Sequence, residues 1–137
     1  MKASLEEYTV DEISAMKKPL GNKNYDVYDI VMTDICYKFD DLIMKDDDLK
    51  KNIDEYTQLR QLNFFLMSFV SNKKMALTER EQVKLRELIY NVDQAALRNP
   101  NGKAYKAYNQ AYRKCMLEFL KRSARFELNE PTNKIIR

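Results

Sequence analysis

The residues most suggestive of chemistry lie in one stretch, "KAYKAYNQAYRK", which occupies Lys103–Lys114. Tyrosines and cations follow one another in it at short intervals. Lysine and arginine neutralise phosphates and aromatic rings stack on unpaired bases, so the combination is typical of proteins that bind single-stranded nucleic acid. Such a site requires rings and cations on one surface. The secondary structure that carries them therefore decides whether the site exists.

The stretch begins a predicted helix that runs from Lys103 to about Leu128. At about 100° per residue, the rings gather on one face and the cations on the opposite face. We therefore expect the tyrosines to be core residues and the cationic face to bind a partner. The ring face comprises Tyr105, Tyr108, Tyr112, Cys115, Phe119 and Phe126, and the cationic face comprises Lys103, Lys106, Arg113, Lys114, Lys121 and Arg125.

The stretch "DDDLKKNIDE" has the carboxylates of a calcium loop but not their spacing. An EF-hand loop has a glycine at its sixth position and a glutamate at its twelfth. Counted from Asp46, these positions hold Lys51 and Thr57. We expect no metal here, and we interpret the aspartates as caps of the next helix.

Catalytic residues are scarce. The chain has no histidine, which is the commonest general base, so nothing of that kind could activate Cys36 or Cys115. Both glycines, Gly21 and Gly102, lie in predicted turns outside any glycine-rich loop that could hold a phosphate. We therefore expect a protein that is not an enzyme and has no cofactor. Carboxylate chemistry is the third and least supported interpretation.

Charge is distributed unevenly along the chain. Residues 1–60 carry a net charge of −5 and residues 61–137 carry +8, within an overall +3. The second predicted helix is acidic and the last is basic, so their surfaces either neutralise each other within the fold or meet in a head-to-tail assembly. The candidate partner-binding aspartates on the second helix are Asp26, Asp29, Asp40 and Asp41. By periodicity we expect its carboxylates to face water.

Composition and periodicity predict an all-α fold. A chain of 137 residues with 2 glycines and 3 prolines has few turn formers, and capping boxes at Thr9/Glu12 and Thr78/Glu81 mark helix starts. We predict a compact bundle of about five helices, four of them long, in a single domain of residues 1–128 with a tail of residues 129–137. The helices run from Val10 to about Lys18, Tyr25 to Met44, Leu49 to Ser71, Glu79 to Arg98, and Lys103 to about Leu128.

Two helices have distinctive apolar patterns. In the helix from Glu79, a buried face is predicted for Leu85, Leu88, Ile89, Val92, Ala95 and Ala96. In the helix from Leu49, the stretch "LNFFLMSFV" is apolar nearly all round, so we expect other helices to cover it on every side. The alternative is that it is half covered and meets a partner.

"LTEREQVKLRELI" (Leu77–Ile89) resembles the opening helix of LuxR-type DNA-binding domains, which often starts Leu-Thr-x-Arg-Glu. In that family a short turn and a recognition helix follow at once. Here the helix continues to about Arg98 and then meets "NPNG". The resemblance therefore covers one helix only.

The function predicted from the sequence is non-catalytic. We expect a protein-protein interaction or assembly protein that docks through charged helix faces on another protein or on a further copy of itself. A virion subunit or a phage-type regulator of a host protein fits this description. A cytoplasmic location is expected, since the two cysteines form no disulfide framework and no stretch could span a membrane. The alternative function is a nucleic-acid-binding module that uses the basic face of the last helix.

Overall fold

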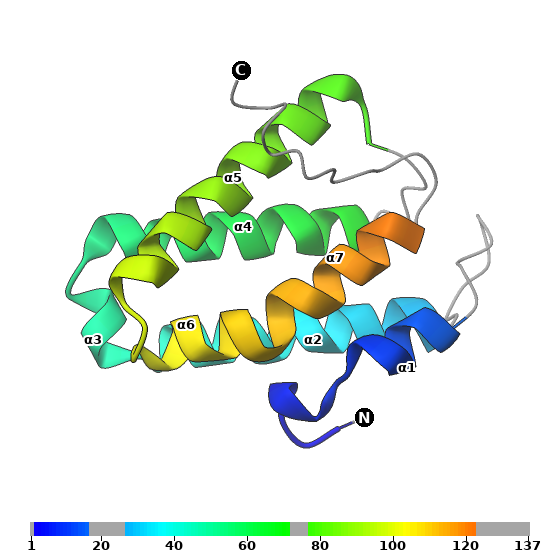
Figure 1. Ribbon diagram of the computed structural model, residues 1–137, viewed down its shortest axis with the longest axis horizontal. Coiled ribbons are helices and arrows are strands. Elements are labelled where there is room, and N and C mark those ends of the chain that lie inside the picture. Colours follow the sequence, from blue (N-terminus) through cyan, green and yellow to red (C-terminus); the bar gives the residue numbers. More distant parts are fainter. Residues whose placement is uncertain (1, 17–26, 72–76, 123–137) are drawn as a thin grey trace.

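The computed structural model describes residues 2–16, 27–71 and 77–122 (Figure 1). These residues form helices and no β-strand, so the predicted all-α fold is confirmed for them. The elements are η1 (Leu5–Glu7), α1 (Val10–Ala15), α2 (Val27–Met44), α3 (Asp47–Lys50), α4 (Ile53–Ser71), α5 (Glu79–Arg98), α6 (Lys103–Ala107), η2 (Tyr108–Tyr112) and α7 (Arg113–Arg122). The last three form one continuous helix, called here the last helix.

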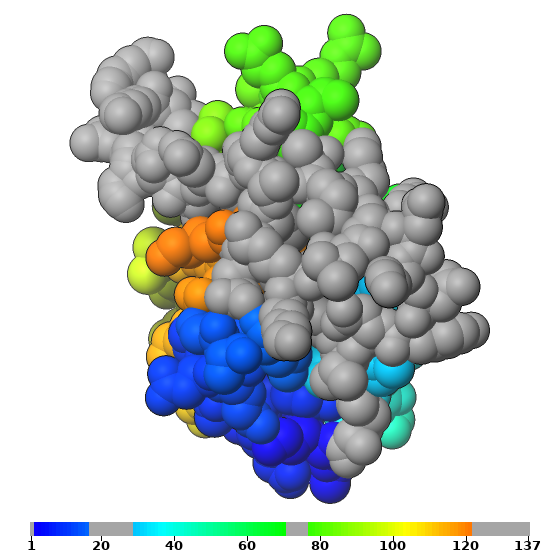
Figure 2. Space-filling model, turned by 90° about the vertical axis from the view of Figure 1, so that its right-hand side faces the viewer, coloured from blue at the N-terminus to red at the C-terminus, as the bar shows by residue number. Residues whose placement is uncertain are grey.

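The long helices pack in two layers. Helices α2 and α4 run antiparallel side by side, and α5 and the last helix cross them, diverging from a common end near α3 (Figure 1). α4 contacts α2 on one side and α5 on the other. At the opposite end from α3, the N-terminal segment covers the bundle, with η1 against η2 and α1 against α7. Figure 2 shows α1 directly beside α7.

Polar caps fix where the helices start. Both predicted capping boxes form: the backbone N–H of Glu12 donates to Thr9 Oγ1, and that of Glu81 donates to Thr78 Oγ1. The predicted helix from Leu49 to Ser71 is divided in two. Asp46 caps α3, and the Asn52 side chain accepts from the Glu55 N–H and starts a separate helix, α4. Asn52 interrupts the helix because its side chain satisfies backbone donors that a continuous helix would use itself.

The last helix contains one turn of π-helix at Tyr108–Tyr112. Hydrogen bonds from i to i+5 rotate the chain less per residue than an α-helix does, so the residues beyond the turn lie on a different side from the one that 100° steps predict. The buried set is correspondingly wider than the predicted ring face. It includes Ala104, Ala107, Ala111, Met116 and Leu120 besides Tyr105, Tyr108, Tyr112, Cys115 and Phe119. Phe126 and the predicted helix end at Leu128 lie outside the described residues, as does the tail of residues 129–137.

The predicted core positions are largely confirmed. All six residues predicted for the buried face of α5 are buried, and the three tyrosines of the last helix are at most 3% exposed. The expectation that the stretch Leu62–Val70 is covered on every side is wrong, and the alternative of a half-covered stretch holds. Phe64 is 46% exposed, because α2, α5 and the last helix contact α4 only on its other sides.

Tyr108→Ala should destabilise the fold by about 3–5 kcal/mol, the usual result of truncating a buried aromatic residue. Tyr108→Phe keeps the ring and loses only the hydroxyl bond to Asp93, so it should cost about 1 kcal/mol. Urea denaturation followed by circular dichroism measures both. An alanine variant as stable as the wild type would contradict the core placement.

Candidate functional site: polar contacts and exposed helix faces

Each buried tyrosine donates a hydrogen bond from its hydroxyl to a polar side chain. Tyr105 donates to Glu55 Oε1 at 3.2 Å, Tyr108 to Asp93 Oδ1 at 2.8 Å, and Tyr112 to Asn63 Oδ1 at 2.8 Å. Tyr8 donates in the same way to Asp34. The rings are therefore core and the hydroxyls are occupied, so none of the four presents a free phenol to a ligand.

Burial makes these phenols harder to ionise. Desolvation, followed by the hydrogen bond to Asp34, raises the pKa of Tyr8 to about 12. Burial is also the main cause that raises the pKa of Tyr105, Tyr108 and Tyr112 above its ordinary value. At neutral pH these side chains are hydrogen-bond donors that hold helices together, and they are poor acids or bases.

The thiols are buried as well. Cys36 and Cys115 have no disulfide partner and lie in the core. Burial raises the pKa of the Cys36 thiol to about 12 and that of Cys115 to about 11. Since the thiolate is the nucleophile, neither cysteine is activated. Among residues 2–16, 27–71 and 77–122, no group of three carboxylates or thiols is arranged to hold a metal ion.

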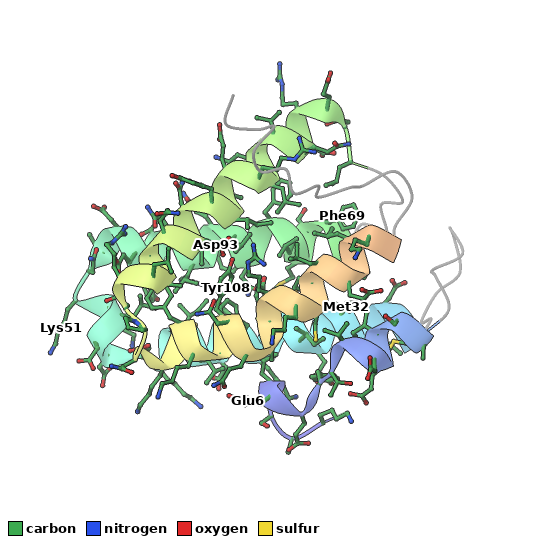
Figure 3. The ribbon with its side chains drawn as sticks, in the orientation of Figure 1. Glu6, Met32, Lys51, Phe69, Asp93 and Tyr108 are labelled. Carbon is green, nitrogen blue, oxygen red and sulfur yellow. The ribbon has the colours of Figure 1, made fainter. Side chains whose placement is uncertain are left out.

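Arg113 does not lie free on the cationic face. Its Nε donates to Asp93 Oδ1 at 2.9 Å and its Nη2 to Asp93 Oδ2 at 2.8 Å, so the two side chains form a bidentate pair between α5 and the last helix. Tyr108, beside Asp93 in Figure 3, shares that carboxylate. The hydrogen bonds to Asp93 raise the pKa of Arg113. The expectation that Arg113 points outward is wrong: it is half-buried and holds helices together.

Four other predicted cations are exposed along the last helix. Lys103, Lys106, Lys114 and Lys121 form what we call the basic ridge. None of the four has a carboxylate oxygen within 4 Å among the residues that the structure describes. Arg125, the sixth predicted cation, lies outside them. The ridge is thus shorter than the predicted face but carries uncompensated charge.

The aspartates of α2 do not form the predicted acidic surface. Asp29 is only 7% exposed, so the expectation that it faces water is wrong. Asp40 lies 3.5 Å from Arg60 Nε, and Asp41 lies 3.0 Å from Lys45 Nζ. Asp26 falls outside the described residues. Asp40 and Asp41 are therefore paired with cations of the same chain, and a contact between the ridge and α2 of a second copy stays a prediction.

A different surface, which sequence analysis missed, lies on the outer side of α2 and α4. We call it the aromatic face, and it comprises Ile30, Tyr37 and Met44 of α2 with Ile53 and Phe64 of α4, all of them exposed. Tyr37 is 60% exposed. The seven-residue spacing of Ile30, Tyr37 and Met44 signals one helix face, but their apolar character pointed to burial.

The aromatic face and the basic ridge lie on opposite sides of the molecule. On the inner side of α2, Phe39 stacks on Tyr112 of the last helix with 3.9 Å between ring centroids. Tyr37, two residues earlier in the same helix, points the other way because each residue turns about 100°. The ridge lies on the side of the last helix that faces away from α2.

Comparison with known proteins finds no matching family model, no similar curated protein and no similar solved structure. No helix among the described residues is long and apolar enough to cross a membrane. The two surfaces are therefore interpreted from their own residues.

Neighbouring cations on the last helix offer a direct test of the Arg113 assignment. Arg113→Glu should cost about 2–3 kcal/mol of stability, because it removes charged hydrogen bonds and places two carboxylates together. Lys114→Glu changes the charge equally at an exposed position and should stay within about 0.5 kcal/mol of the wild type. Thermal or urea unfolding compares them. Equal effects of the two variants would contradict a structural role for Arg113.

Alkaline pH should unfold the protein cooperatively. The unfolded chain releases tyrosine protons near pH 10, whereas Tyr8 holds its proton to about pH 12 in the fold. Stability from such raised pKa values is complete below pH 10 and is lost as the pH rises toward 12. Tyrosinate absorbance and circular dichroism should therefore change together above pH 10. Ionisation of all nine tyrosines with the helices intact would contradict this.

Proposed function

We propose that this protein is a non-catalytic binding protein whose basic ridge docks on an acidic surface of another protein. The observation that carries the proposal is the set of four exposed lysines, Lys103, Lys106, Lys114 and Lys121, which have no carboxylate partner within the described part of the chain. Lys38, Lys45 and Arg113, by contrast, are neutralised within the fold. Uncompensated charge on one helix attracts an oppositely charged partner and speeds its encounter.

The surroundings of the ridge favour a protein partner over phosphate. Glu118 interrupts the ridge and accepts a hydrogen bond from Ser14 of α1 at 2.8 Å. α1 packs against α7 and carries Asp11 in its first turn, beside Glu12, whose charge Lys2 neutralises at 2.6 Å. The carboxylates of Glu118 and Asp11 repel a phosphate backbone. Charged groups across a protein interface are arranged so that opposite charges meet, so a surface of mixed charge suits a protein partner.

The positions of the aromatic rings on the last helix also favour a protein partner over nucleic acid. A single-strand binder stacks bases on rings that lie beside its cations. Here Tyr105, Tyr108 and Tyr112 are buried on the other side of the same helix. The alternative function, binding of duplex nucleic acid through the same four lysines, relies on charge alone and is an outcome of the experiment below.

The buried tyrosine hydroxyls donate hydrogen bonds and the thiols are buried, which supports a non-catalytic role. The buried tyrosines donate to carboxylates or to Asn63, and the pKa values of both cysteines are raised by burial. A subunit of a larger assembly, or a regulator that docks on a host protein in the cytoplasm or in a virus particle, uses a surface of this kind.

The test reverses three ridge lysines that point outward. Lys106, Lys114 and Lys121 are changed to Glu together, and Lys45, Lys50 and Lys51 are changed to Glu in a matched control with the same net charge. Fluorescence anisotropy measures binding to polyglutamate and to duplex and single-stranded oligonucleotides over a range of salt. We expect the wild type and the control to bind polyglutamate and the ridge variant to lose it, with added salt weakening the wild type similarly.

Nucleic acid should bind only loosely to any of the three proteins. A protein that contacts several phosphates would instead show log affinity falling against log salt with a slope of about −0.9 per phosphate. Submicromolar binding of an oligonucleotide at physiological salt, lost in the ridge variant, would overturn the proposal in favour of the nucleic-acid alternative. Equal polyglutamate binding by the ridge variant and the wild type would overturn the proposal, and equal oligonucleotide binding by the two would overturn the alternative.

A further inference from the structure

The aromatic face is rich in the residue types that dominate protein interfaces. Tyr37, Phe64 and Met44 are exposed at mid-helix or near a helix end, and Arg60 lies among them. Tryptophan, tyrosine and arginine are the residues most enriched at hot spots. Two helices of about 27 Å, each about 10 Å across, give a flat area of about 540 Å², of the same order as the roughly 800 Å² per partner of a standard interface.

At the centre of this face, Asp40 and Arg60 form an incomplete ion pair. Arg60 Nε lies 3.5 Å from Asp40 Oδ1, and both atoms are buried without a hydrogen-bond partner. The guanidinium carbon lies 4.7 Å from the centroid of Phe64 and 5.8 Å from that of Tyr56, so two rings hold it in place. A guanidinium fixed in this way is already ordered for a further contact.

The outward atoms of the pair are unused. The two Nη atoms of Arg60 and Oδ2 of Asp40 make no hydrogen bond within the described part of the chain, and they are not among the buried atoms. A donor fork and an acceptor therefore lie next to each other on one surface. A partner that presents a carboxylate beside a guanidinium or ammonium group complements both.

Apolar residues flank this pair on both sides. Along α2, Tyr37 lies three residues before Asp40 and Met44 four residues after it. Along α4, Tyr56 and Phe64 lie four residues before and after Arg60. A half-turn about an axis through the pair therefore brings apolar side chains onto apolar side chains, which is the condition for an isologous interface.

We propose that a second copy of this chain covers the aromatic face, in a two-fold dimer in which Arg60 of each copy binds Asp40 of the other. The second copy supplies the carboxylate and the guanidinium that the incomplete pair requires, in the required arrangement. It also does not repel the first, because Asp40 with Arg60 and Asp41 with Lys45 leave this face balanced in charge. This dimer leaves both basic ridges exposed and is independent of their function.

Sedimentation velocity of the full chain over a range of concentrations tests the dimer. We expect a reversible monomer–dimer equilibrium. Phe64→Asp and Tyr37→Asp should each weaken dimerisation at least about 30-fold, as loss of a hot-spot residue does. Tyr90→Asp is the matched control, because Tyr90 is a tyrosine of α5 with 54% exposure outside the face. Its dimerisation should equal that of the wild type.

A charge exchange tests the partner directly. Asp40→Arg and Arg60→Asp should each be monomeric, while an equimolar mixture of the two should form a heterodimer, because each variant then faces the opposite charges. Circular dichroism confirms that both variants fold; if either does not, the exposed Tyr37 and Phe64 variants decide. A wild type that stays monomeric at all concentrations, or a dimer lost in Tyr90→Asp and kept in Phe64→Asp, would overturn the proposal.

Discussion

One aromatic residue, Tyr112, joins the three helices on which the rest of the fold is assembled. Its ring stacks on Phe39 of α2, and its hydroxyl donates to Asn63 of α4. Asn63 in turn donates through Nδ2 to the backbone carbonyl of Cys36 at 3.0 Å. The ring stacking and the hydrogen bonds of the buried Asn63 amide therefore stabilise the same junction. An unpaired amide in the core would cost free energy. This junction fixes which sides of α2, α4 and the last helix face solvent.

The orientation of the helices at this junction explains where the two proposed binding surfaces lie. Once the rings of the last helix face inward, Lys106 and Lys114 face outward on the far side of that helix. Once Phe39 faces inward, Tyr37 faces outward on the far side of α2. The tyrosine hydroxyls and the thiols, which could do chemistry, lie in the interior, and the exterior carries the charges and rings of the two proposed binding surfaces.

Ion pairs within the fold neutralise part of the uneven charge along the chain. Several acidic residues of the first half are neutralised by neighbours or between helices, as Asp34 is by Lys38 and Asp40 by Arg60. Burial alone would raise the pKa of Asp34, but hydrogen bonds from Tyr8 and Lys38 outweigh it and the pKa is lowered. In the second half, Arg113 is neutralised by Asp93 while the ridge lysines are not. The excess positive charge is therefore concentrated on one helix.

The sequence by itself determined the helical elements and much of the core, because these depend on local periodicity and caps. Thr9 and Thr78 start helices through bonds to residues three positions later, and apolar spacing gave the buried face of α5. Only the tertiary structure decided the roles of Arg113, Asn63 and Arg60. Their partners lie 20 residues or more away in the chain: Asp93 is 20 from Arg113 and Tyr112 is 49 from Asn63. Periodicity predicts which side of a helix faces the core, but the packing of the helices decides which side chains of neighbouring helices contact each other.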